Sequence, residues 1–121
     1  MKTTKEHFKA FENEARRMID LLGLKEWEVS FIHERLEGAV AQIGYIINSR
    51  TAVFTLSTEL DEGTAAIFDP NLSARHEAYE LLLSDMAFRM RCGKIDEGEI
   101  QRLTHAIIRR LEKLCVHGVV E

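Results

Sequence analysis

The chain lacks several features that would place it in a specialised class of protein. Its two cysteines, Cys92 and Cys115, form neither a CxxC pair nor the disulfide framework of a small secreted domain. We therefore expect two reduced thiols in a cytoplasmic protein. No stretch approaches the roughly 18 apolar residues that cross a bilayer, and the charged N-terminus has no apolar signal-peptide core. These absences predict a soluble, unprocessed protein that has no membrane partner.

An excess of one charge is also missing. The chain has 16 lysines and arginines against 20 aspartates and glutamates, and the two signs are interspersed. Because nucleic-acid-binding surfaces are basic patches or stripes, we expect no nucleic-acid partner. The sequence shows no repeat, low-complexity segment or linker, so residues 1–121 are predicted to form a single domain. At 45% apolar residues, this domain can bury a core without a structural metal, and a bound metal would therefore serve function.

A helix is predicted over residues 3–22. Thr3 and Glu6 have the spacing of a capping box, and Gly23 suits the left-handed position that follows a helix. Apolar side chains recur every three or four residues, which places them in one stripe that faces a core: Phe8, Phe11, Ala15, Met18, Ile19 and Leu22. His7, beside this stripe, is expected to be a solvated surface histidine.

Alternation of apolar and polar residues then predicts β-strands at 27–33 and 39–47, and a run of β-branched and aromatic residues predicts a third at 51–56. Parallel neighbours need a crossover of about a dozen residues or more, so these closely joined strands are predicted to form an antiparallel three-stranded meander. His33, at the end of the first strand, is expected to be solvated or hydrogen-bonded. Residues 57–68 lack a period and are predicted to form a loop at one face of a cleft.

The last third of the chain predicts two helices. Asp69 and Pro70 are typical of a helix N-cap and first turn, and this helix is expected to run to about Arg91. Its core face is predicted to contain Leu72, Tyr79, Leu83, Met86 and Met90. After a break at residues 93–95, Asp96 and Glu99 form another capping pair, and the final helix ends no later than Gly118. Its stripe is Ile100, Leu103, Ile107, Leu111 and Leu114. The expected fold class is therefore α+β: a helix, a meander and two further helices.

The segment that carries recognisable chemistry is His76-Glu77-Ala78-Tyr79-Glu80, an HExxE string. In the HExxH motif of zinc peptidases, two histidines one helical turn apart bind the metal, and the glutamate between them acts on a water molecule. His76 and Glu80 lie about 40° apart on a helix and could bind one ion, with Glu77 beside it as the general base. The alternative is that His76 and Glu80 form a weak surface pair.

The order of motifs resembles the small phage- and prophage-encoded zinc metallopeptidase family, which has a minimal zincin fold. The resemblance covers roughly residues 24–114 and rests on Trp27-Glu28-Val29, Gly38-Ala39, Thr51-Ala52-Val53-Phe54-Thr55-Leu56, Arg75-His76-Glu77, Leu81-Leu82-Leu83 and Thr104 to Glu112. It implies a metal-dependent peptidase that uses zinc and acts on a peptide or protein substrate. Carried over by position, the metal ligands are His76, Glu80 and His105, and the catalytic base is Glu77.

Two positions depart from the family pattern. Glu80 stands where the family has its second histidine, and Thr104 stands where an acidic residue precedes His105. On a helical wheel Thr104 lies about 40° from Ile100 and faces the core, whereas His105 lies about 140° away. His105 can therefore join the site only if the cleft opens on the flank of its helix. The alternative function is a catalytically inactive zincin-like protein that acts as an interaction or structural module. The amphipathic first and last helices also allow a homodimer as well as a monomer.

Overall fold

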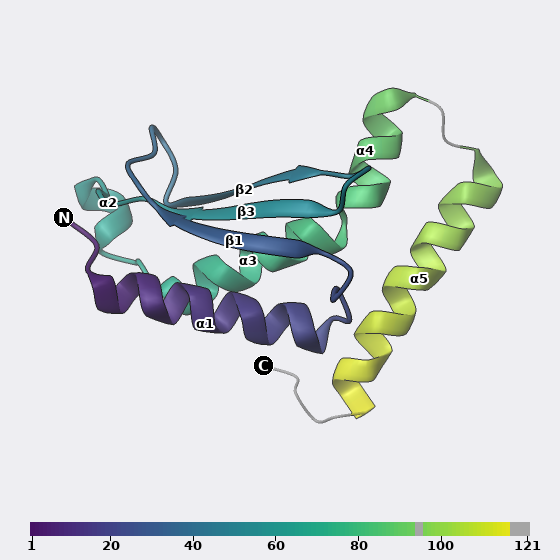
Figure 1. Ribbon diagram of the computed structural model, residues 1–121, viewed down its shortest axis with the longest axis horizontal. Coiled ribbons are helices and arrows are strands. Elements are labelled where there is room, and N and C mark those ends of the chain that lie inside the picture. Colours follow the sequence, from purple (N-terminus) through teal and green to yellow (C-terminus); the bar gives the residue numbers. More distant parts are fainter. Residues whose placement is uncertain (94–95, 117–121) are drawn as a thin grey trace.

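The computed structural model describes residues 1–93 and 96–116 and shows a mixed α+β fold (Figure 1). Helix α1 comes first, strands β1, β2 and β3 follow, and the remaining helices complete the chain: α1 (Lys5–Leu21), β1 (Glu28–His33), β2 (Ala41–Ile46), β3 (Thr51–Leu56), α2 (Glu62–Ala65), α3 (Pro70–Leu82), α4 (Ser84–Cys92) and α5 (Glu97–Val116). The expected α+β class is thus confirmed. No helix in the described residues is long and apolar enough to cross a membrane.

The sheet is mixed, so the predicted antiparallel meander is wrong. Its strand order is β1-β3-β2, with β3 parallel to β1 and antiparallel to β2. The crossover rule is still satisfied, because residues 34–50, which include β2 itself, separate the two parallel strands. The seven residues between β1 and β2 carry the chain past the position that β3 fills, and β2 becomes an edge strand.

Helices α1 and α3 pack against each other and cover one face of the sheet (Figure 1). The predicted alternation is confirmed: Val29, Phe31, Ile43 and Tyr45 pack against the core, while their sequence neighbours are exposed. The centre of the core contains Phe11, Leu22, Phe54, Leu56 and Leu81. Burial of these large apolar side chains holds the helices on the sheet, at about 25 cal/mol per Å² of apolar surface removed from water.

The start of α1 differs from the prediction. Thr4, not Thr3, caps the helix, and its partner in the capping box is His7, whose Nδ1 accepts a hydrogen bond from the Thr4 N–H. His7 is half-buried, with its ring edge against Phe68, so it is not the solvated histidine expected. The Thr3 hydroxyl instead donates to the Ser57 carbonyl at 2.6 Å and contacts His33 Nε2 at 2.7 Å. His33 is therefore hydrogen-bonded, as predicted.

The stretch 57–68 is not entirely a loop, because Asp61 caps the short helix α2. The helix predicted from Pro70 to Arg91 is two helices, α3 and α4, divided at Leu83. At the division, the buried Ser84 hydroxyl donates to the Leu81 carbonyl at 2.6 Å. A serine hydroxyl bonded to a carbonyl of the preceding turn competes with the helical ladder and commonly bends a helix.

The core face predicted for this helix is also wrong. Leu72, Tyr79, Leu83 and Met90 are exposed. The side of α3 that faces the core contains instead Ala74, Glu77, Ala78, Leu81 and Leu82. The two fully buried alanines let α1 approach α3 closely. The close packing of the two helices offsets the free-energy cost of leaving larger apolar side chains in solvent.

Helix α5 stands apart from the sheet in Figure 1 and meets the end of α4. The αL residue Gly93, with φ of 67°, ends α4 as expected, and the Asp96 side chain accepts a hydrogen bond from the Glu99 N–H. Ile107 packs against the core, but Ile100 and Leu111 are exposed, so the predicted stripe is only partly buried. The predicted break residues Lys94 and Ile95, the predicted helix limit Gly118, and the side chains of Leu114 and Cys115 lie outside what the structure describes.

Candidate metal centre

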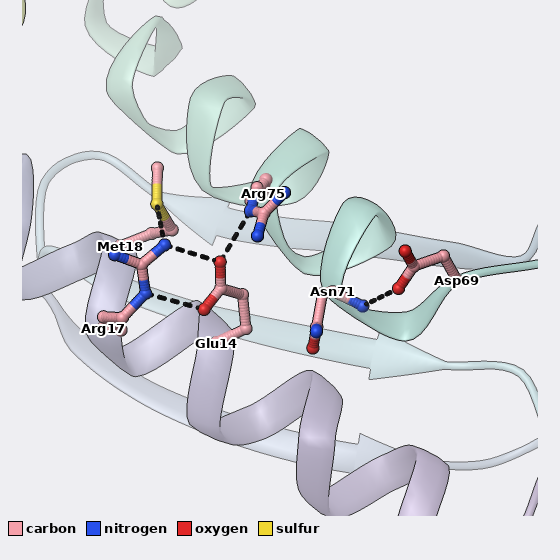
Figure 2. Close-up of polar contacts among 6 residues, drawn as sticks. All are labelled: Glu14, Arg17, Met18, Asp69, Asn71 and Arg75. Atoms are coloured by element: carbon pink, nitrogen blue, oxygen red, sulfur yellow. Dashed lines mark hydrogen bonds and ion pairs between the residues drawn. The ribbon is translucent and has the colours of Figure 1, made fainter. Parts of the chain in front are cut away.

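Helix α3 is positioned by contacts at its start and on its inner side. The Asp69 carboxylate accepts a hydrogen bond from the Asn71 N–H at 2.9 Å, and Pro70 occupies the first turn, where a missing N–H costs nothing. On the inner side, Arg75 Nε donates to Glu14 Oε2 of α1 at 2.6 Å. Figure 2 shows Glu14 between Arg75 and Arg17, which donates to both of its oxygens at 2.7 and 2.8 Å.

Glu14 is the ion-paired residue that fixes α3 against α1. Its side chain is only 11% exposed. The hydrogen bonds and charges of Arg17 and Arg75 outweigh the effect of burial and lower the pKa of Glu14 to about 2. Because Arg75 directly precedes His76, this ion pair sets the rotation of α3 at the point where the HExxE residues begin.

The three residues of the motif bring their donor atoms together. One atom each from His76, Glu77 and Glu80 lies within 4.8 Å of the other two. His76 Nε2 and Glu80 Oε2 are 3.6 Å apart, and their side chains are 72% and 54% exposed. Two donors of one tetrahedral zinc ion, each at 2.0–2.2 Å, are about 3.4 Å apart, so this pair already has nearly the required spacing. The chemistry and spacing of the donors therefore fit a divalent ion such as zinc.

Glu77 occupies a different environment from its two neighbours. The residue is 5% exposed and lies in a pocket lining together with Val40 and Ala41, at the start of β2. Burial raises the pKa of Glu77 to about 8, and the hydrogen bond and negative charge of Glu80 act in the same direction. A general acid–base group works best when its pKa lies near the operating pH, and groups with strongly shifted pKa values concentrate at functional sites.

His105 is the expected ligand that the structure does not bring to this cluster. Within the described part of the chain, the metal-competent group consists of His76, Glu77 and Glu80. His105 lies on the exposed side of α5, whereas Thr104 is half-buried, as the helical wheel predicted. The structure thus unites three of the four predicted site residues on one helix.

The site opens beside the first residues of β2. An open pocket of about 280 Å³ is lined by Val40, Ala41, Leu72, Ser73, His76 and Glu77. Periodicity could not predict the contributions of Val40 and Ala41, because they reach the site only through the packing of β2 beside α3. Glu14 did carry a local signal: it lies within the apolar stripe of its helix, where a carboxylate needs a cationic partner.

Comparison with known proteins does not identify a relative: no family model, curated protein or solved structure matches the chain. The resemblance to small zinc metallopeptidases therefore stays a prediction, and the functional argument depends on the geometry of α3.

Proposed function

We propose that this chain is a zinc-dependent peptidase in which His76 and Glu80 hold the metal and Glu77 is the general acid–base. The observation that carries the proposal is the convergence of these three side chains within 4.8 Å. When bound, zinc supplies a water molecule of lowered pKa and a Lewis acid for the peptide carbonyl. The resemblance to the phage and prophage family supports the same assignment.

The roles of the three residues follow from their environments. His76 and Glu80 are exposed and can adjust to an ion by small side-chain rotations. Glu77 is buried beside them, where it can take a proton and return it to a leaving amine. The Glu14–Arg75 ion pair maintains the inward position of Glu77 by fixing α3 against α1.

The peptide substrate is proposed to lie along β2. This strand is at the sheet edge, and its sequence, Ala41-Gln42-Ile43-Gly44-Tyr45-Ile46, has no charged residue and no proline. Charges and prolines are the usual means by which an edge strand is protected from pairing with another chain. An extended peptide that adds to this edge passes the pocket containing His76 and Glu77.

Zinc binding to the full chain, purified without a histidine tag, tests the metal assignment. We expect close to one equivalent of zinc and a rise in the melting temperature, because a ligand that binds only the native state stabilises it. His76→Ala should weaken zinc binding by at least about tenfold. Less than about a tenth of an equivalent of zinc, together with an unchanged melting temperature, would reject the proposal.

His105→Ala is the matched control, because it removes an exposed histidine that lies outside the cluster. It should leave zinc affinity unchanged if α3 alone supplies the metal-binding side chains. A loss equal to that of His76→Ala would instead show that α5 contributes a ligand. Glu77→Gln should retain zinc and abolish peptide hydrolysis, since it preserves shape but cannot take a proton.

A second candidate function is an inactive zincin-like interaction module. The observation that favours it is the number of donors: with Glu77 as the base, the cluster supplies two metal ligands, whereas catalytic zinc sites have three protein ligands. This candidate predicts that His76→Ala and Glu77→Gln leave stability and biological activity unchanged.

A further inference from the structure

A second pocket lies at the other end of β2, where helix α4 meets the strand. Its volume is about 340 Å³, and it is lined by Tyr45, Ile46, Ile47, Asn48, Phe88 and Arg91. Figure 1 shows α4 beside this end of the sheet, away from the start of β2. The two pockets therefore lie at opposite ends of one edge strand.

The chemistry of this pocket suits a side chain with an apolar stem and a negative end. Phe88, Ile46 and Ile47 supply apolar surface, and among the lining residues that the structure describes only Arg91 is charged. Arg91 Nη2 donates to the Tyr45 hydroxyl at 3.0 Å, which orients the guanidinium and uses one of its five N–H donors.

The other charged side chains of α4 form ion pairs outside this pocket. Asp85 accepts two hydrogen bonds from Arg50, both at 3.0 Å, and Arg89 donates to Glu99 at 2.9 Å. Within the described residues, Arg91 has no such carboxylate partner. The pocket is thus a local cationic site in a chain whose net charge is −4.

Strand geometry relates this pocket to the candidate metal centre. Ala41 lines the first pocket and Tyr45 the second, and both point to the helix-covered face of the sheet. They are four residues apart, or about 13 Å along a strand. Peptide residues opposite Ala41 and Tyr45 would point to the same face, because cross-strand partners share a face and side chains alternate with a period of two.

We propose that the Arg91 pocket selects peptides by binding a glutamate side chain of an extended segment paired antiparallel to β2. The glutamate lies four residues N-terminal to the peptide residue opposite Ala41. Its carboxylate meets Arg91, and its methylene groups lie against Phe88. The proposal rests on the proposed function for its peptide ligand, but it assigns a specificity that the metal site does not supply.

Fluorescence anisotropy with capped, labelled Thr/Ser peptides tests the pocket on the full chain without added metal. One peptide carries a single glutamate at the stated position, a second has lysine there, and a third has glutamine, which keeps the shape of the side chain and removes its charge. We expect the first peptide to bind about fivefold more tightly than the others, as for one partly exposed ion pair. Equal affinities for the three peptides, or no binding, would overturn the proposal.

Arg91→Glu should reverse the preference in favour of the lysine peptide. Arg102→Glu makes the same charge change at an exposed position of α5 outside the pocket and should leave the preference unchanged. If Arg102→Glu also reverses it, the preference comes from overall charge and the pocket is refuted. Zinc binding is measured separately, so a chain that selects the glutamate peptide and binds no zinc supports this pocket while rejecting the peptidase.

Discussion

Replacing Glu14 with glutamine removes the negative charge that links α1 to α3 and preserves the shape of the side chain. The pKa of Glu14 falls from 4.5 to about 2 in the folded chain. Each pKa unit corresponds to about 1.4 kcal/mol. Because the side chain is 11% exposed, solvent screens this interaction little. Ionised Glu14 therefore contributes about 3 kcal/mol to the free energy of unfolding at pH 7.

The direction of the pH dependence follows from the lowered pKa. The unfolded chain binds the Glu14 proton more readily than the folded chain does, so the contribution is complete above about pH 5 and is lost as the pH falls towards 2. Urea unfolding followed by circular dichroism should give a difference of about 3 kcal/mol between wild type and Glu14→Gln at pH 7. The difference should become small near pH 2.

Glu12→Gln is the matched control on the same helix. Glu12 pairs with Arg16 at 2.9 Å, but the two side chains are 32% and 54% exposed. An exposed pair of this kind contributes about 0.5 kcal/mol. Equal losses for Glu12→Gln and Glu14→Gln at pH 7, or a Glu14→Gln deficit that stays constant down to pH 2, would refute the reasoning.

Three further substitutions test other parts of the fold. Burial lowers the pKa of His33, so the free energy of unfolding should decrease as the pH falls below 6.5. His33→Gln should reduce this pH dependence when stability is measured by urea unfolding. An unchanged dependence of stability on pH in the variant would contradict this. Gly93→Ala should lower the free energy of unfolding by about 1 kcal/mol, because alanine is strained at the left-handed φ of 67°. Gly44 has an ordinary φ and open space around it, so Gly44→Ala should lower the free energy of unfolding by less, and thermal unfolding measures both. Ala78→Leu should lower the free energy of unfolding by about 1–3 kcal/mol, because a larger side chain overpacks the α1–α3 contact. Tyr79→Leu, at an exposed position, should have a far smaller effect. Similar losses for the two variants would show that the contact between α1 and α3 is not tightly packed.

The local elements were predictable wherever periodicity and end signals agree. The helix ends at Gly23 and Gly93 and the start at Asp69 were expected from residue type, because backbone conformation at these positions is a local property. Two strands were predicted from alternation, and the third from a run of β-branched and aromatic residues, for the same reason. The exact N-cap of α1 was not predictable, because Thr3 and Thr4 are chemically equivalent in the sequence. Only the hydrogen bonds of Thr3 to Ser57 and His33 in the folded chain distinguish them.

The inner face of α3 was less predictable. Choosing the largest apolar residues selected Leu72, Tyr79 and Leu83, which are exposed. The buried face uses Ala74 and Ala78, whose small size matters only because α1 lies directly against them. A prediction based on hydrophobicity alone gives small residues little weight, so it assigned the wrong face of α3 to the core.

The sequence by itself determined the α+β class, the approximate elements and the HExxE string, since each depends on residues within a few positions of one another. Only the tertiary structure decided the β1-β3-β2 order, the burial of Glu77 and the separation of His105 from the α3 cluster. These features depend on contacts between segments far apart in the chain, such as Glu14 with Arg75. The physical reason is that periodicity records which side chains prefer burial, whereas packing decides which faces meet.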